Sequence, residues 1–313
     1  MDHDTSRETL SRPAVVCGLA VFCCLLWGSA FPSIKSGYAL FQIAAEDWQT
    51  QLLFAGLRFT LAGLMVIAAG SLTSRRFLVP AAPALRKIAV LSLLQTVVQY
   101  TFFYLGLAHA SGVTSSILGS SSVFFSILLA SLLFHMEKVT VRKIAGCLIG
   151  FAGVVTVNLF QAQALDAGFH LNGEGFILIS SLSCSLAAIM MKRYSAGEDP
   201  RMLTGWQFLL GGLILSAFGL AAGGRIRTVS APGLVLLLYL GFISAAAYTI
   251  WSILLKYNPV SGVTIYGFTN PVFGVILSGL ILGEAGQAFS VKNLLALGFV
   301  CAGIWLVNSR TAE

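Results

Sequence analysis

The sequence predicts an all-α integral membrane protein in which ten transmembrane helices form two inverted five-helix repeats. Three observations support this prediction: the composition is apolar, the apolar residues fall into ten runs of membrane-spanning length, and the second half of the chain repeats the first. Hydrophobic residues make up 57% of the 313 residues and charged residues only 10%, whereas a soluble domain carries about 25% charge. We therefore expect nearly the whole chain to lie in a lipid bilayer.

The apolar runs are each about 20 residues long, which is the length of a helix that crosses a bilayer core about 30 Å thick. They cover residues 14–36, 50–71, 85–108, 112–134, 141–160, 174–192, 202–222, 232–255, 260–283 and 291–308. The first run continues into Trp27-Gly28-Ser29-Ala30-Phe31-Pro32 without a small-x-small cleavage site. We therefore interpret it as the first helix and not as a signal peptide.

An internal duplication relates the two halves of the chain. Ser111-Gly112-Val113-Thr114 recurs as Ser261-Gly262-Val263-Thr264, and Ala152-Gly153 recurs as Ala302-Gly303. Further matches pair Val157-Asn158 with Val307-Asn308, and Phe59 and Gly63 with Phe208 and Gly212. Because each repeat holds five helices, an odd number, the second must insert upside down relative to the first. We expect one repeat over 14–160 and the other over 174–308, with a binding site near the middle of the membrane.

Lysine and arginine divide unevenly between alternate loops. With the N-terminus inside the cell, 14 of them fall on the inner side: Arg7, Arg12, Arg75, Arg76, Arg86, Lys87, Lys138, Arg142, Lys143, Lys192, Arg193, Arg201, Lys256 and Arg310. Four fall on the outer side, namely Lys35, Arg225, Arg227 and Lys292. The positive-inside rule therefore predicts a multi-pass protein of the cell (plasma) membrane with both termini in the cytoplasm. Since topology accounts for the net charge of +7, we expect no nucleic-acid partner.

Three stretches carry a family resemblance. They are Leu26-Trp27-Gly28-Ser29-Ala30-Phe31-Pro32-Ser33-Ile34-Lys35, Asn270-Pro271-Val272-Phe273-Gly274 with the later Leu282-Gly283-Glu284, and Phe134-His135-Met136-Glu137. Together with the ten runs and the repeat, they make residues 15–308 similar to the EamA family of the drug/metabolite transporter superfamily. The resemblance implies a transporter in which helices 1, 3, 4, 6, 8 and 9 surround a central cavity. Export, and an amino acid or similar small metabolite as substrate, are implied by the resemblance alone.

Polar and aromatic residues at helical spacing lie along these same six helices. Because an amide facing lipid would cost several kcal/mol, glutamine and asparagine must face protein or water. The residues expected to bind substrate are Trp27, Phe31, Lys35, Gln95, Gln99, Tyr100, Ser115, Ser122, Ser185, Tyr248, Trp251, Tyr266 and Asn270. Each also has a structural interpretation, since stripes of small residues in membrane helices are often packing surfaces. We assign the pairs Gly146/Gly150, Gly219/Gly223 and Gly279/Gly283 to packing.

Two cations near the predicted spans have more than one interpretation. Arg58 lies within the second run, where a cation is expected to have a functional partner. The structural alternatives are that Arg58 extends its side chain outward to the membrane surface or pairs with Glu46 or Asp47. Lys35 lies nearer the outer end of the first helix, on the same face as Trp27, and is a candidate to attract an anionic substrate group.

None of the 12 acidic residues falls in the core of a predicted span. Glu137 and Glu284 lie at helix ends, where we expect them to tie helix termini to adjacent loops. The four histidines also lie away from the middle of any span. Because proton relays in transporters use buried Asp, Glu or His, the sequence shows no proton carrier. Transport down the gradient of the substrate is the expectation.

The residues do not support an enzyme. The sequence contains no G-x-S-x-G, H-E-x-x-H, phosphate loop or metal-ligand spacing, so no catalytic residue, metal or cofactor is expected. The six cysteines lie in predicted spans and are interpreted as small packing residues. The alternatives that stay open are a channel or facilitator pore for small solutes and an importer of a metabolite or sugar-like solute. The expected partners are a small-molecule substrate and the lipid bilayer, with a homodimer as an open alternative.

Overall fold

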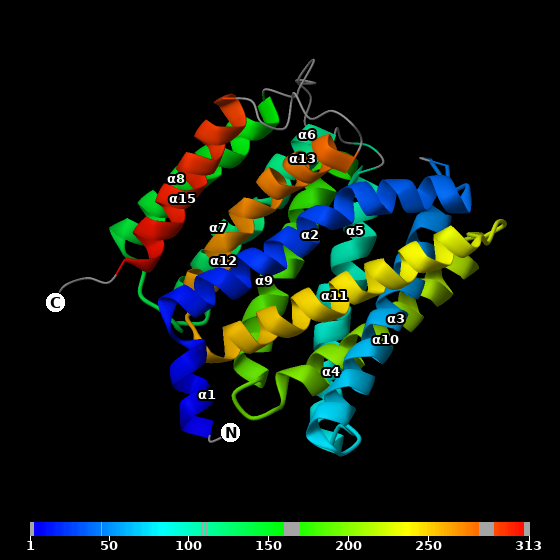
Figure 1. Cartoon of the computed structure of the whole chain (residues 1–313), viewed down its shortest axis with the longest axis horizontal. Helices are drawn as coiled ribbons and strands as arrows, with labels where there is room; N and C mark the ends of the chain where they lie inside the picture. Colours follow the sequence, from blue (N-terminus) through cyan, green and yellow to red (C-terminus); the bar gives the residue numbers. More distant parts are fainter. Residues whose placement is uncertain are drawn as a thin grey trace.

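The computed structural model describes residues 3–44, 46–107, 109, 112–159, 170–281 and 291–309, and in these ranges the chain forms helices, turns and loops but no strand (Figure 1). The helices are α1 (His3–Leu10), α2 (Pro13–Phe41), α3 (Trp48–Ser74), α4 (Ala82–Leu91), α5 (Gln99–Leu107), α6 (Gly112–Gly119), α7 (Ser121–Leu128), α8 (Val141–Leu159), α9 (Phe176–Tyr194), α10 (Pro200–Ala221), α11 (Ala231–Tyr257), α12 (Val260–Thr264), α13 (Thr269–Ile281) and α15 (Val291–Asn308). Short π turns η1 (Ser92–Val98), η2 (Leu129–Leu133) and η3 (Leu171–Gly175) and the 3-10 turn η4 (Ile265–Phe268) adjoin them.

Six helical stretches of the described chain are long and apolar enough to cross a membrane: Pro13–Phe41, Trp48–Ser74, Ala82–Leu107, Leu171–Tyr194, Pro200–Ala221 and Ala231–Tyr257. The all-helical membrane class predicted from composition is therefore confirmed. The other four predicted runs also contain helix, although two of them are divided into short pieces, α6 with α7 and α12 with α13. The count of ten crossings stays a prediction. The polar helix α1, ahead of the first span, was not predicted.

The main irregularities of the helices lie near predicted site residues. Pro32 lies inside α2, which continues through it. Pro271 is in the first turn of α13, where a backbone N–H has no intrahelical partner, so proline costs little there. The break in this run instead falls at η4, immediately before α13. A π turn, η1, likewise precedes Gln99, and such turns are frequent at functional sites.

Helices α3 and α10 lie side by side with their backbones in close approach (Figure 1). A methyl group added to Gly63 would lie 2.7 Å from the carbonyl oxygen of Gly205, and one added to Gly212 would lie 2.8 Å from that of Gly56. The two contacts are reciprocal, because the repeat offset that relates Gly63 to Gly212 also relates Gly56 to Gly205. Reciprocal contacts of this kind arise when a two-fold axis, perpendicular to both antiparallel helices, relates one helix to the other.

Helices α8 and α15 form a second pair of the same kind, drawn in green and red on the left of Figure 1. A methyl group on Gly153 would lie 2.7 Å from the carbonyl oxygen of Ala296, and one on Gly303 would lie 2.5 Å from that of Gly146. The repeat offset of 150 relates the two contacts, because it pairs Gly153 with Gly303 and Gly146 with Ala296. Both glycine pairs allow backbones to approach in a way that side chains would prevent.

The predicted packing role is confirmed for Gly146, Gly150 and Gly219. A methyl group added to Gly150 would contact the Phe268 ring, and one added to Gly219 would lie 2.7 Å from the Leu53 backbone nitrogen. Gly223 differs, because it faces open space and has a φ of +99°, so it serves the turn after α10. The side chains at 279 and 283 lie outside the described residues.

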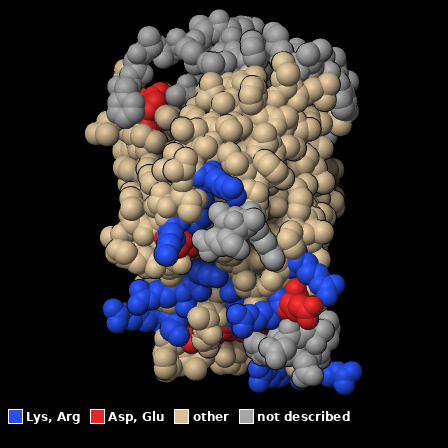
Figure 2. Space-filling view, turned by 90° about the vertical axis from the view of Figure 1, so that its left-hand side faces the viewer, with Lys and Arg blue, Asp and Glu red and all other residues tan. Residues whose placement is uncertain are grey.

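Lysine and arginine side chains gather toward one end of the molecule, the lower end in Figure 2. In Figure 1 this end carries α1, the α3–α4 connection and the α9–α10 connection, all of which belong to the predicted inner side. Ion pairs there join Lys87 to Glu198 at 2.7 Å and Arg201 to Asp199 at 2.8 Å. The broad tan band above it is the surface expected to face lipid.

Candidate functional site

Aromatic side chains from α2, α5, α10 and α11 meet in the interior. The ring of Trp27 lies edge-on to those of Tyr248 and Trp251, with centroids 4.9 and 5.0 Å away. Tyr248 also contacts Phe208, and its hydroxyl lies 2.9 Å from that of Tyr100. We name these five residues the aromatic cluster. The structure thus brings together four residues that were predicted separately, on three helices.

The aromatic cluster lies near the middle of the spans that supply it. Trp27 is at the midpoint of α2, about 21 Å from either end at about 1.5 Å per residue. Tyr248 and Trp251 lie one and two turns beyond the midpoint of α11. Both helices are candidate membrane spans, so the cluster lies at the depth expected for the bilayer centre.

Four of the predicted site residues hold a buried polar atom without a hydrogen-bond partner in the described part of the chain. These atoms are Trp27 Nε1, Gln99 Oε1, Ser115 Oγ and Asn270 Oδ1. Leaving such a group unpaired costs about 1–3 kcal/mol, and folded proteins rarely do so. A bound molecule with polar groups, or water, would satisfy these atoms.

Gln95 and Ser185 instead make contacts between helices. The Gln95 side-chain oxygen accepts a hydrogen bond from Gln207 Nε2 at 3.2 Å, which joins η1 to α10. The Ser185 hydroxyl donates to the backbone carbonyl of Ser122 at 2.7 Å, and Ser181 donates to carbonyls at the end of α6. The serines of α9 therefore donate hydrogen bonds to backbone carbonyls at the break between α6 and α7. For these serines the structure favours a packing role between helices.

Three further predicted residues differ in their position: Lys35 lies apart from the aromatic cluster, Tyr266 lies in the core that contains Trp251, and the Phe31 side chain is outside the described residues. Lys35 is exposed on α2. At 3.6 residues per turn, a separation of eight residues turns it about 80° away from Trp27, so the two do not share a face as predicted. Tyr266 is buried in η4, in the same core as Trp251. The side chain of Phe31 lies outside the described residues.

Arg58 follows neither structural alternative predicted for it. The residue is only 3% exposed, so its side chain does not reach the membrane surface. Its Nε donates to the hydroxyl of Ser244 at 2.9 Å, and no described carboxylate pairs with it. Asp47 instead caps α3 by accepting from the Thr50 backbone N–H at 3.0 Å. Arg58 lies close to the midpoint of α3, which is too far from either helix end for these predicted contacts.

Sequence reasoning also missed a tyrosine beside the aromatic cluster. Tyr38 of α2 packs with Phe59, Tyr100 and Tyr248 in one hydrophobic core. The Tyr38 hydroxyl is buried without a hydrogen-bond partner among the described residues, and the ring centroid of Phe59, in the same core, lies 5.0 Å from the Arg58 guanidinium carbon. Tyr38 follows Phe31 by seven residues, two helical turns, and this spacing was the available indication.

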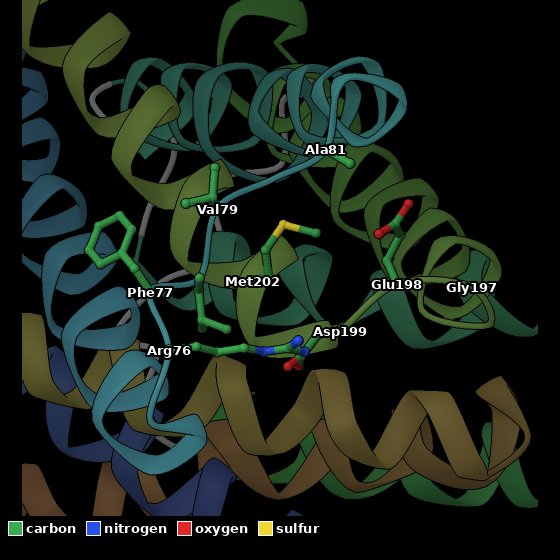
Figure 3. Close-up of a pocket in the computed structure, with 9 residues that line it drawn as sticks. Arg76, Phe77, Val79, Ala81, Gly197, Glu198, Asp199 and Met202 are labelled. Carbon is green, nitrogen blue, oxygen red and sulfur yellow. The ribbon is translucent and has the colours of Figure 1, made fainter.

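A separate hollow opens at the basic end of the molecule. Figure 3 shows this cavity of about 290 Å³, which is lined by Arg76, Phe77, Leu78, Val79, Ala81, Gly197, Glu198, Asp199 and Met202. No predicted site residue lines it. Its two acids already pair with Lys87 and Arg201. We interpret the hollow as a crevice between two loops.

Glu137 ties the end of one helix to the start of another. Its carboxylate accepts hydrogen bonds from the Ser261 backbone N–H at 3.2 Å, from the Ser261 hydroxyl, and from Lys143 Nζ at 2.7 Å. Burial alone would raise the pKa of this carboxyl, but the hydrogen bonds from Lys143 and Ser261 outweigh burial and lower the pKa. Glu137 is therefore ionised at neutral pH, in the structural setting predicted for it. Glu284 lies outside the described residues.

Glu137→Gln is expected to lower the Tm at pH 7, because it removes the charge from a nearly buried ion pair worth about 1–3 kcal/mol. Since the folded-state pKa is lowered, the stabilisation is present above the unfolded-state pKa of about 4.3 and is lost as the pH falls through the folded-state pKa. Thermal unfolding of both proteins in detergent, at pH 7 and in the acid range, measures the difference. A difference that does not shrink in acid contradicts this assignment.

Comparison with known families gives two matches in tandem. The EamA-like transporter family matches residues 15–159 and, a second time, residues 171–309. The two matches together cover nearly the whole chain. Each of the close helix pairs, α3 with α10 and α8 with α15, takes one helix from each match.

Two relatives of similar length carry the name of transporter. The uncharacterized transporter YvbV of Bacillus subtilis is 25% identical over 94% of this chain and 91% of its own length. The uncharacterized inner membrane transporter YedA of Escherichia coli K12 is 27% identical over 91% and 87%. A WAT1-related chloroplastic protein of Arabidopsis thaliana is 27% identical over 90% of this chain, which spans 66% of that relative. One crystal structure shares the fold, with a TM-score of 0.74 and 19% identity over 95% of this chain and 98% of that one.

Proposed function

Since the chain belongs to the EamA-like transporter family, we propose that it is a secondary carrier that exports a small organic metabolite, such as an amino acid, by alternating access. The family and the relatives support transport. Export and the amino-acid class rest on the family resemblance of the sequence. The partners are the substrate and the lipid bilayer, and a homodimer is compatible with this function.

The observation that carries the proposal is the aromatic cluster near the middle of α2 and α11, in which the buried Trp27 Nε1 has no hydrogen-bond partner among the described residues. Inverted-repeat transporters bind substrate at this depth. The rings of Trp27, Tyr248 and Trp251 offer apolar area and can hold a cationic group at about 0.5–2 kcal/mol per contact. Gln99 and Asn270 can orient a carboxyl, amino or hydroxyl group. We place the substrate between these residues.

The reciprocal glycine contacts support two inverted repeats, over 14–160 and 174–308, as the moving parts. A two-fold axis perpendicular to α3 and α10 lies in the plane of the membrane that these helices cross. Two halves related in this way can exchange conformations, so that one shared site opens first to one side and then to the other. The basic end of the molecule is placed in the cytoplasm, with both termini, and the protein in the plasma membrane.

Reconstitution into proteoliposomes tests this function. We expect a screen of radiolabelled amino acids and related metabolites to find a solute whose flux saturates with concentration. Flux that rises linearly for every transported solute would indicate a channel or pore.

The same vesicles, with and without an imposed pH gradient, test whether transport is coupled to protons. We expect no uphill accumulation, since no acid lies in the core of a predicted span. Accumulation driven by the gradient and abolished in a Glu137→Gln, Glu284→Gln double variant would make these glutamates proton carriers.

A further inference from the structure

Arg58 is a fixed positive charge in the interior of the spans. It lies near the midpoint of α3 and contacts Ser244, which is the midpoint of α11, about 20 Å from either helix end. Arginine does not lose its proton in proteins, so burial cannot neutralise it. An unpaired charge at this depth is strongly unfavourable unless an opposite charge compensates it.

The described residues around Arg58 supply hydroxyls and a ring but no carboxylate. The Ser244 hydroxyl donates to the Leu240 carbonyl at 3.1 Å and accepts from Arg58 Nε at 2.9 Å, which fixes the plane of the guanidinium. The guanidinium carbon lies 5.0 Å from the centroid of the Phe59 ring. The two terminal nitrogens, Nη1 and Nη2, make no hydrogen bond to the part of the chain that the structure describes. They form one edge of the fork that binds carboxylate or phosphate oxygens.

The aromatic cluster adjoins this cation. The Phe59 ring lies 4.5 Å from Tyr100 and stacks on Phe208 at 5.1 Å. The Tyr38 hydroxyl, in the same core as Phe59, has no hydrogen-bond partner in the described chain and is able to donate to an anion. The Tyr100 and Tyr248 hydroxyls form a hydrogen bond with each other, so one of their two protons is available as well. A positive fork beside flat apolar rings matches a molecule with an oxyanion at one end and a flat apolar body at the other.

We propose that Arg58 is the anion-binding group of the substrate site, so that the transported solute is a small organic anion or zwitterion whose oxyanion pairs with the guanidinium. Its apolar part packs on Trp27, Tyr248 and Trp251. The inference rests on the proposed carrier function, which it narrows to substrates with a carboxylate or another small oxyanion. Ser244 is a positioning residue, because it orients the guanidinium.

Three benzene derivatives of similar size test the charge requirement: benzoate, the neutral benzamide and the cationic benzylamine. Binding to the full-length protein in detergent is measured from the rise of Tm with probe concentration. We expect saturable stabilisation by benzoate and little by the other two. Arg58→Gln should weaken benzoate binding about tenfold to a hundredfold, which is the range for a hydrogen bond to a charged group. Arg58→Lys should retain part of the affinity, and Arg225→Gln, which removes an exposed cation, should retain all of it.

Equal stabilisation by benzoate and benzamide, no stabilisation by benzoate, or unchanged benzoate affinity in Arg58→Gln would overturn the proposal. If Arg58→Gln does not fold, Ser244→Ala replaces it and should weaken benzoate several-fold while benzamide is unaffected; equal benzoate affinity in this variant is then the contradicting result. Flux assays separate the two proposals. Saturable flux that depends neither on the charge of the solute nor on Arg58 would contradict the anion site and support the carrier function. Charge-selective binding without flux of any solute would support the anion site and contradict the carrier function.

Discussion

Asn270→Leu is expected to lower substrate affinity about tenfold while the protein folds as well as the wild type. The side-chain oxygen of Asn270 is buried and has no partner among the described residues. Replacing an unpaired polar group by an apolar one of similar size costs little or stabilises. A bound substrate, in contrast, loses its hydrogen bond, worth about 1 kcal/mol or more. Gln99→Leu should behave in the same way, since its side-chain oxygen is in the same state.

Gln207→Leu is the matched control. Gln207 donates to Gln95 and accepts from Thr96, so its loss leaves two buried partners unpaired. We expect this variant to lower the Tm clearly, with unchanged substrate affinity in the folded fraction. Tm and the concentration dependence of flux are measured on all three variants. Normal affinity in both Asn270→Leu and Gln99→Leu would move the site elsewhere and leave these amides as packing residues.

Gly303→Ala is expected to destabilise the fold by about 1–3 kcal/mol or more, the cost of overpacking a rigid contact. The added methyl group would lie 2.5 Å from the Gly146 carbonyl oxygen and 2.7 Å from the Gly150 nitrogen, and both are backbone atoms that cannot turn away. Gly298→Ala, on the same helix α15, meets nothing within 4 Å. It should leave the Tm unchanged or raise it, because alanine favours helix.

The yield and Tm of the two alanine variants in detergent check this difference. Because the α8–α15 contact is reciprocal, Gly153→Ala should cost about as much as Gly303→Ala, since it meets the Ala296 carbonyl oxygen at 2.7 Å. A tolerated Gly303→Ala would mean that the two helices are not held in close backbone contact, and would weaken the case for a two-fold relation between the repeats.

Local pattern was sufficient to predict that each apolar run contains helix, and to choose four residues that the structure brings together in the aromatic cluster. Each apolar run contains helix because its length and composition leave the backbone no other way to satisfy its hydrogen bonds in lipid. Trp27, Tyr100, Tyr248 and Trp251 could be chosen because they recur at helical spacing on spans that also carry polar residues, although the same spacing selected Lys35, which is exposed. Helical spacing does not say which helix lies opposite. The contacts of Gln95 with Gln207 and of Ser185 with Ser122 depend on how each helix is rotated about its axis relative to its neighbour. The sequence of a single helix does not determine that rotation.

Arg58 shows the same limit most clearly. The sequence suggests partners in the nearby loop, Glu46 or Asp47, because local contacts are the ones that a sequence shows. The structure pairs it with Ser244, 186 residues away, through the packing of α3 against α11. The duplication, in contrast, relates contacts across the two halves to each other, in addition to relating residues that match. Gly63 with Gly205 and Gly212 with Gly56 touch because residues related by the repeat lie about one axis.

Counterflow tests the central claim, a single site open alternately to the two sides, most directly. Proteoliposomes are loaded with unlabelled substrate, chosen by the flux screen, and diluted into a trace of labelled substrate. We expect label to accumulate transiently above its equilibrium level in the wild type and much less in Asn270→Leu. Label that rises only to equilibrium, at a rate that does not depend on the substrate inside, would contradict the carrier mechanism.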